Sequence, residues 1–171
     1  LRKSIALYNE NRKLIRELYD LRAERPWQAP AAEVYLAVRA GLLLPVEEHS
    51  ALMRDYLAAA RAEERPVRDN CRVVLTGMFC EQPPLNLIKS LELSGCYVVD
   101  DDLLLGNRLM AAPVPLDGDP VEALARTFVG SARRCSILYE PDPEGKKRLM
   151  ADRARAARAD AMLISMVGQD A

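Results

Sequence analysis

One short polar stretch of the chain carries the side chains best suited to chemistry. The residues from Gly77 to Gln82 follow the apolar, strand-like run Val73–Thr76 and precede Pro83 and Pro84, which predict the start of a helix. Open α/β sheets usually bind ligands in the loops after their strands. A thiol, a carboxylate and an amide at this position therefore make the loop of residues 77–82 the first place to look for a functional site.

Cys80 is the candidate ligand for a metal. It lies just before the expected helix, whose amino terminus carries partial positive charge and would favour a thiolate. A thiolate is the form that a metal ion or an iron-sulfur cluster binds. The alternative is a small buried hydrophobic residue, which is the commoner role of a single cysteine. The polar neighbours Glu81 and Gln82 favour a site, because packing explains them poorly.

The carboxylates of Glu81 and of the run Asp100–Asp102 each have more than one interpretation. Glu81 could act as an acid or base, but capping the following helix is its commoner role. The run Asp100–Asp102 follows a second strand and could hold a divalent cation or a ribose, whereas a solvated turn that caps a short helix is the favoured interpretation. The loop after the first strand lacks GxGxxG spacing, which disfavours a dinucleotide site.

The remaining reactive side chains are expected to be structural. His49 follows the acidic residues Glu47 and Glu48 in a helical pattern, so we expect an exposed residue with a structural role. Cys71 and Cys96 flank strands and are expected to be core thiols, and Cys135 lies near a helix end. None of the four cysteines has zinc-site spacing, and their low density favours reduced thiols.

The elements that position the loop fall into two parts. Apolar side chains recur every three or four residues from 4 to 21, which predicts a long amphipathic helix, and residues 31–40 and 45–63 predict two more. Segment 1–65 is therefore expected to be a helical linking segment. Across 66–171, strands at 72–76, 96–99 and 161–166 alternate with helices at 84–94, 120–134 and 144–158. This predicts an α/β lobe, Rossmann-like or flavodoxin-like, with a parallel sheet of three or more strands and flanking helices.

Composition narrows the class of protein. The 24 Lys and Arg residues nearly balance the 25 Asp and Glu residues, so the net charge of -1 indicates neither a nucleic-acid partner nor a membrane surface. No apolar run approaches the roughly 20 residues of a membrane span, and no signal peptide is visible, so a cytoplasmic location is expected. The chain starts within a helical pattern and its last strand stops near the terminus, so we expect a fragment whose lobe is incomplete at the carboxyl end.

The motifs together resemble one enzyme family, the benzoyl-CoA reductase and 2-hydroxyacyl-CoA dehydratase family. The resemblance rests on Gly77 to Leu85, Leu87-Ile88-Lys89, Leu91-Glu92, Gly95 to Asp102 and Gly106-Asn107-Arg108. Upstream, Ser4 to Arg12 and Glu24 to Trp27 resemble the helical stretch that joins the two α/β lobes of this family. The sequence from Phe79 to Gln82 resembles that of the ATP-dependent reductase branch. The resemblance covers the later part of a cluster-bearing subunit.

The resemblance implies a function in anaerobic aromatic degradation. It implies a 4Fe-4S cluster whose ligands lie largely outside this chain, with Cys80 as a metal ligand, Cys80 and Gln82 as cofactor-binding residues and Glu81 as a catalytic residue. It implies an acyl-CoA thioester substrate, a homologous cluster-bearing subunit as partner and a separate iron-sulfur activator that hydrolyses ATP and delivers single electrons. The reaction would be one-electron reduction of an aromatic acyl-CoA.

Two other functions remain open at this stage. The first is a 2-hydroxyacyl-CoA dehydratase subunit, in which the electron forms a ketyl radical that expels the hydroxyl group. The second is a non-catalytic lobe that packs on a cluster-bearing partner. One observation favours this second alternative. The stretch from Val167 to Ala171 contains no cysteine, whereas the family commonly has a Phe-Cys pair at this place.

Overall fold

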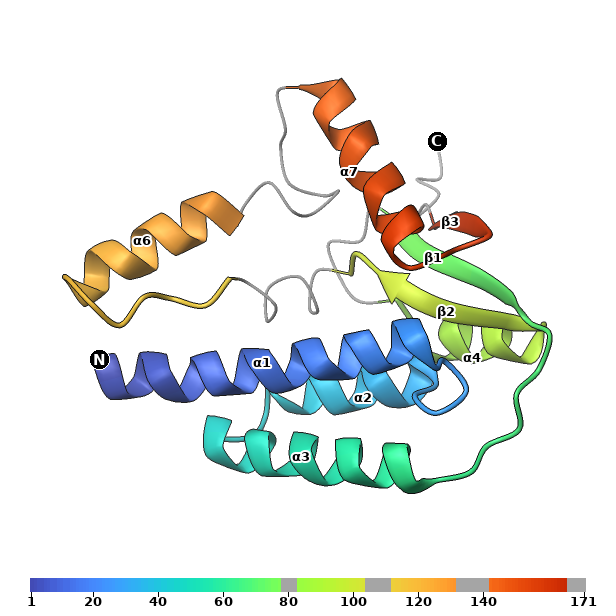
Figure 1. Ribbon diagram of the computed structural model, residues 1–171, viewed down its shortest axis with the longest axis horizontal. Coiled ribbons are helices and arrows are strands. Elements are labelled where there is room, and N and C mark those ends of the chain that lie inside the picture. Colours follow the sequence, from blue (N-terminus) through green and yellow to red (C-terminus); the bar gives the residue numbers. More distant parts are fainter. Residues whose placement is uncertain (78–82, 104–111, 132–141, 166–171) are drawn as a thin grey trace.

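The computed structural model describes residues 1–77, 83–103, 112–131 and 142–165 (Figure 1). Three helices come first: α1 (Arg2–Glu24), α2 (Ala31–Ala40) and α3 (Val46–Ala62). The elements that follow are β1 (Cys71–Gly77), α4 (Leu85–Leu93), β2 (Cys96–Asp101), α6 (Pro120–Ser131), α7 (Pro143–Ala156) and β3 (Ala161–Ser165). The predicted α/β class, with a helical segment before a sheet, is confirmed. The domain boundary near residue 65 stays a prediction.

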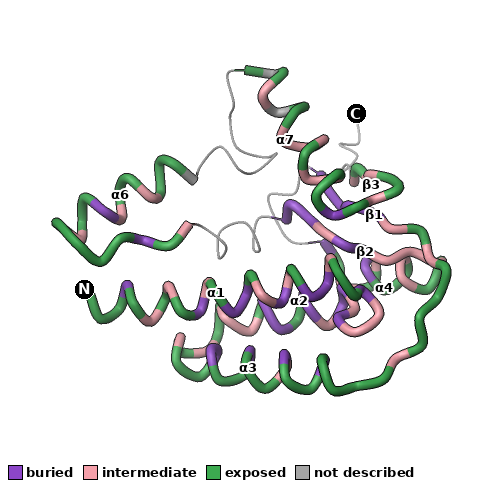
Figure 2. Tube along the Cα trace, viewed as in Figure 1, coloured by how far each residue is buried: buried purple, intermediate pink, exposed green. Residues whose placement is uncertain are grey.

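The three helices of the first segment share one hydrophobic cluster. The apolar side of α1 packs against α2 and α3 around the fully buried Ile15, Leu18 and Met53. In Figure 2 the buried residues of α1 and α2 lie on the sides that face other elements, and α3 is exposed on its outer side. None of the described helices is both long and apolar enough to cross a membrane.

His49 is buried within this segment, so the prediction of an exposed histidine is wrong. Its side chain is 1% exposed, and its Nε2 lies 2.9 Å from the carbonyl oxygen of Ala37. Its Nδ1 lies 3.0 Å from Nδ2 of Asn11. Gly41 makes room for the ring, because a Cβ at this position would lie 2.7 Å from Cε1 of His49. The histidine joins α1, α2 and α3, and the prediction of a structural role agrees with these contacts.

The described strands form a parallel sheet in the order β2-β1-β3. Side chains of α2 and α4, including Tyr35 and Ile88, cover one face around Val73. Ala157, at the carboxyl end of α7, packs with Val74 on the other face. Figure 1 shows α7 on one side of the sheet and α2 and α4 on the opposite side. The central strand β1 is therefore buried on both faces, which explains its continuous apolar sequence.

An extra residue in β2 changes which way its last side chains face. The register with β1 shifts between Val73 and Val74, and Val99 is left without a partner on β1. Such a β-bulge interrupts the regular alternation of side chains across a strand. Asp100 consequently accepts two hydrogen bonds from Arg153 of α7, whereas Asp101 forms the closer ion pair with Arg22 of α1, at 2.7 Å against 3.9 Å for Asp100. The two consecutive carboxylates thus connect the strand to helices on opposite faces of the sheet.

The α6 helix packs on the amino-terminal half of α1. Ala123 of α6 shares a small apolar cluster with Ile5 and Val114. Asn9 fixes the chain before α6, since its Nδ2 donates to the Val114 carbonyl at 2.8 Å and its Oδ1 accepts from the Val114 amide at 2.9 Å. Asp119 caps the helix by accepting from the amide of Glu122 at 2.9 Å.

Candidate functional site

The carboxyl edge of the sheet contains a topological switch point. The chain continues from β1 to β2 on one side, and β3 pairs on the other side of β1. Ligands of open α/β sheets bind in the crevice at such a point, outside the carboxyl ends of the two strands. Gly77 at the end of β1 is the register partner of Ser165 at the end of β3. The loop that the sequence singled out therefore leaves the sheet at the switch point.

Gly77 is required by the close approach of these two strand ends. A Cβ at Gly77 would overlap the carbonyl oxygen of Ser165 and crowd its amide nitrogen. Because backbone atoms cannot move aside as a flexible side chain can, only glycine fits here without a shift of one strand. Gly77, where the loop begins, is thus placed directly beside Ser165 at the end of β3.

The predicted site residues Cys80, Glu81 and Gln82 lie outside the described residues. The chain is described again from Pro83, which is buried. The hydroxyl of Tyr35 donates to the Pro83 carbonyl at 3.3 Å and accepts from Nη1 of Arg39 at 3.0 Å. The loop is therefore held at both ends, by β1 pairing at Gly77 and by α2 at Pro83.

The run Asp100–Asp102 is part of the folded sheet, so the favoured interpretation of a solvated turn is wrong. The strand β2 continues through Asp101, and the amide of Asp102 donates to the Leu75 carbonyl at 3.1 Å. Asp101 and Asp102 are 4% and 1% exposed. The sequence suggested a turn because aspartate is rare in strands, whereas here specific cations and hydroxyls compensate its burial.

Arg22 of α1 is the cation that faces Asp101. Its Nη2 lies 2.7 Å from Oδ2 of Asp101, and its guanidinium carbon lies 4.2 Å from the centre of the Tyr19 ring. The hydroxyl of Tyr19 donates to Oδ1 of Asp101 at 3.2 Å. Burial alone would lower the pKa of Arg22, but Asp101, Tyr19 and Asp100 together outweigh burial and raise it. Burial and the Asp101 charge raise the pKa of Tyr19, so both groups keep their ordinary protonation states.

Arg153 of α7 is the corresponding cation on the other face. Its Nε and Nη2 donate to the two carboxylate oxygens of Asp100 at 2.9 and 3.0 Å, and Nη2 also donates to the Asp101 carbonyl. This paired geometry is the strongest arrangement of an arginine on a carboxylate. Burial nevertheless raises the pKa of Asp100, because it outweighs the attraction of Arg153.

A side-chain hydrogen bond also joins the carboxyl end of β1 to the residue that follows β2. The hydroxyl of Thr76 donates to Oδ1 of Asp102 at 2.9 Å. Thr76 precedes Gly77, so this contact fixes the strand end from which the loop begins. Within the described ranges no three potential ligands gather into a metal site, and the carboxylates of Asp100 and Asp101 are bound to arginines. The alternative of a divalent cation at this run therefore finds no support here.

The described cysteines do not fit an iron-sulfur cluster. Cys71 and Cys96 are register partners at the amino-terminal edge of the sheet, away from the loop of residues 77–82. Cys71 is exposed, so its prediction as a core thiol is wrong, whereas Cys96 is half-buried against the cluster beneath α4. Cys135, like Cys80, falls outside the described part. Two thiols at one strand edge cannot supply the ligand set of a cluster, which is usually held by four cysteines.

A wide open cleft of about 520 Å³ also lies at the amino-terminal edge. Its walls include Trp27 and Tyr97, whose ring centres are 6.4 Å apart, and Arg65, which is bound to Glu33 at 2.9 Å. Among the described residues, none of those at the switch point lines this cleft. This cleft thus lies at the edge of the sheet opposite to the candidate site.

Sequence reasoning missed the two arginines and Tyr19. A signal for Arg22 was present, because it follows Leu18 by four residues and therefore lies on the apolar side of α1. An arginine on such a stripe indicates a buried partner of opposite charge. Arg153 carried no comparable signal, since it belongs to a stretch rich in alanine and arginine.

A family model supplies the decisive comparison. The model described as 2-hydroxyglutaryl-CoA dehydratase, D-component, matches residues 1–168. The chain belongs to this dehydratase D-component family. The match covers the helical segment and the described sheet together, which confirms the resemblance found in the motifs.

Three curated relatives carry two kinds of name. The chain is 48% identical over 165 residues to a subunit of benzoyl-CoA reductase from Thauera aromatica, covering 96% of this chain and 43% of that protein. It is 29% identical over 169 residues to the beta subunit of lactoyl-CoA dehydratase from Anaerotignum propionicum, covering 98% of this chain and 44% of that protein. It is 25% identical over 166 residues to the beta subunit of (R)-phenyllactyl-CoA dehydratase from Clostridium sporogenes, covering 97% and 43%. The chain thus spans less than half the length of these relatives.

Proposed function

We propose that this chain is part of a subunit of an ATP-dependent iron-sulfur enzyme that reduces an aromatic acyl-CoA by single electrons. The observation that carries the proposal is the difference in identity between relatives over nearly the same stretch. Identity is 48% to a benzoyl-CoA reductase subunit, against 29% and 25% to two dehydratase subunits. The reductase-like sequence from Phe79 to Gln82 also supports the reductase branch of the family.

Three residues of the switch-point loop are proposed to carry the function. Cys80 is proposed as an iron ligand, Gln82 as a second cofactor-binding residue and Glu81 as an acid or base beside the substrate. Their position in the sequence supports this, because they lie between Gly77 and Pro83, the two anchored ends of the loop. The remaining cluster ligands are proposed to come from outside this chain, since the described cysteines lie at the opposite sheet edge.

The proposed partners follow from the same relatives. The substrate would be an acyl-CoA thioester, as in the names of all three relatives. The word subunit in these names supports a homologous cluster-bearing partner. A separate iron-sulfur activator would hydrolyse ATP and deliver the electrons, and the assembly would work in the cytoplasm, in anaerobic aromatic degradation. This chain would supply the loop of residues 77–82, and its described part would supply the sheet edge from which that loop begins.

A 2-hydroxyacyl-CoA dehydratase is the second candidate. The 29% identity to a lactoyl-CoA dehydratase subunit extends over 98% of the chain, and the matching family model carries a dehydratase name. In that case the same electron supply would serve removal of a hydroxyl group rather than reduction of a ring.

An activity comparison separates the two. The full-length subunit, its partner subunit and the activator are purified without oxygen and supplied with ATP, a reductant and either benzoyl-CoA or a 2-hydroxyacyl-CoA. Loss of benzoyl-CoA with formation of a ring-reduced product is expected, together with little dehydration of the hydroxyacyl-CoA. Dehydration alone would establish the alternative. Activity that is unaffected by Cys80→Ala would leave the chain with a packing role.

A further inference from the structure

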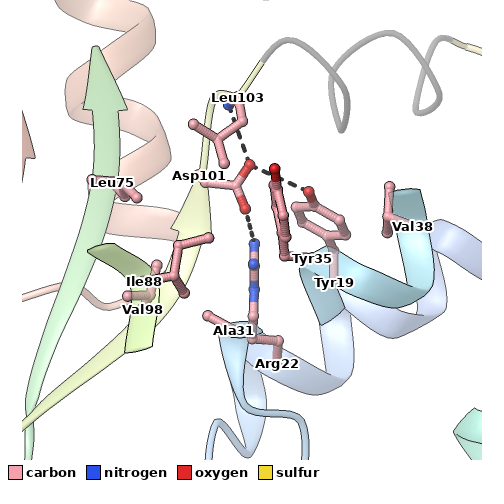
Figure 3. A pocket seen from close by; sticks show the side chains of 10 residues that line it. All are labelled: Tyr19, Arg22, Ala31, Tyr35, Val38, Leu75, Ile88, Val98, Asp101 and Leu103. Carbon is pink, nitrogen blue, oxygen red and sulfur yellow. Dashed lines mark hydrogen bonds and ion pairs between the residues drawn. The ribbon is translucent and has the colours of Figure 1, made fainter. Parts of the chain in front are cut away.

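A small, partly open cavity lies where α1 and α2 meet the sheet (Figure 3). Its volume is about 10 Å³, which is room for the centre of one water molecule. One side is apolar and the other carries polar groups. The lining includes Ile88 and Val98 on the apolar side and Tyr19, Arg22, Tyr35 and Asp101 on the polar side.

Arg22 presents an unpartnered donor at this cavity. Its side chain is 2% exposed. The contact of Nη2 with Asp101 at 2.7 Å is an ion pair without hydrogen-bond alignment, and within the described part of the chain Nε has no hydrogen-bond partner. A buried N–H group without an acceptor is unfavourable, and native proteins nearly always supply one from protein or ordered water.

We propose that the cavity is a binding site for a single water molecule that accepts a hydrogen bond from Nε of Arg22. The same water can donate to the carboxylate of Asp101 and to a tyrosine hydroxyl, so it has the two or more polar partners that a buried water needs. Asp101 retains acceptor capacity, because a carboxylate has about four lone-pair sites and its Oδ1 accepts from Tyr19 and from the Leu103 amide.

Size and charge select water over other occupants. Organic ligands and hydrated ions are too large for a space of about 10 Å³. A bare cation would face the guanidinium of Arg22, and a bare anion would face the carboxylate of Asp101, so neither charge is favoured. Cavities that stay empty are lined by apolar groups alone, which is not the case here.

The site would strengthen the contact between the helical segment and the sheet. Arg22 belongs to α1, and Asp101 lies at the carboxyl end of β2, next to the strand from which the candidate loop begins. A water that completes the contacts of Arg22 would hold α1 against this sheet edge without any change in net charge.

A crystal structure of the full-length subunit, at a resolution that shows buried water, tests the proposal directly. One ordered water within about 3 Å of Nε of Arg22 is expected. A cavity without density, in a structure that shows other buried waters, would overturn the proposal. Density that is identified as an ion by anomalous scattering would overturn it as well.

A pair of matched variants gives an independent test. Val38→Ile adds one methylene to a cavity-lining position of α2, whereas Val34→Ile adds the same group to a buried position of α2 outside the lining. If the cavity holds water, Val38→Ile displaces it and lowers the urea midpoint of unfolding more than Val34→Ile. If the cavity is empty, Val38→Ile fills it, and its midpoint equals or exceeds that of Val34→Ile, which would contradict the proposal.

Discussion

Replacing Arg22 by methionine is expected to weaken the contact between α1 and β2 severely. The substitution keeps an extended side chain but leaves the carboxylate of Asp101, 5% exposed, without the cation at 2.7 Å. Removing one member of a buried ion pair typically lowers the free energy of unfolding by about 3–5 kcal/mol. The lost stacking on Tyr19 acts in the same direction. We therefore expect a loss in this range for Arg22→Met in the full-length subunit.

Urea unfolding with a double-mutant cycle measures the effect. With a denaturant slope of about 2 kcal/mol per M, the midpoint should fall by about 1.5–2.5 M. Arg22→Met combined with Asp101→Asn should lose at least about 2 kcal/mol less than the sum of the two single variants, because no unpaired charge remains. Arg126→Met, which breaks an exposed pair on α6, is the control and should change stability by less than about 1 kcal/mol. A loss below about 1 kcal/mol for Arg22→Met, or strict additivity, would refute the reasoning.

Three further predictions concern the strand ends and α4. Gly77→Ala should lower the free energy of unfolding by about 1–3 kcal/mol, because the added Cβ meets the Ser165 backbone. The helical control Gly130→Ala has open space around the added Cβ and should be neutral or stabilising. Equal melting temperatures of the two variants would contradict this prediction. Thr76→Val should destabilise by about 1.5–3 kcal/mol in urea titrations by removing the donor to Asp102, and Thr76→Ser should retain most of the stability. Burial raises the pKa of Glu92 above its ordinary value near 4.5, so its contribution to stability is present below pH 4.5 and lost as the pH rises through the raised value. The stability of the natural protein relative to Glu92→Gln, which keeps an acceptor for the Ala31 amide, should therefore fall as the pH rises above about 4.5, and a constant or rising difference would argue against this.

Most of the fold could be predicted because its signals are local. Prolines precede α2, α3 and α4, and Gly95, with a φ of +86°, ends the turn into β2. Apolar periodicity placed the described helices and strands within a few residues. The end of β2 was missed because Asp100 and Asp101 are atypical of a strand, and their burial depends on arginines far away in the sequence. The bulge at Val99 is likewise a property of the pairing with β1 and has no signature in the local sequence.

The candidate site could be predicted in its position but not in its surroundings. A polar loop after an apolar strand indicated the carboxyl edge, and the structure places Gly77, where that loop begins, at the switch point and Pro83, where it ends, against Tyr35 of α2. The roles of Cys80, Glu81 and Gln82 stay predictions. The burial of His49 depended on its fit against Gly41 and Asn11, which only tertiary packing brings together.

The most direct test of the proposed function is the iron content and electron paramagnetic resonance spectrum of the full-length subunit, purified without oxygen beside its partner. The spectrum is compared for the natural protein, Cys80→Ala and the matched control Cys71→Ala, whose thiol is exposed at the opposite sheet edge. A reduced-cluster signal that is lost in Cys80→Ala and kept in Cys71→Ala is the predicted result. A signal that survives in Cys80→Ala would contradict the assignment of the switch-point loop as a ligand site.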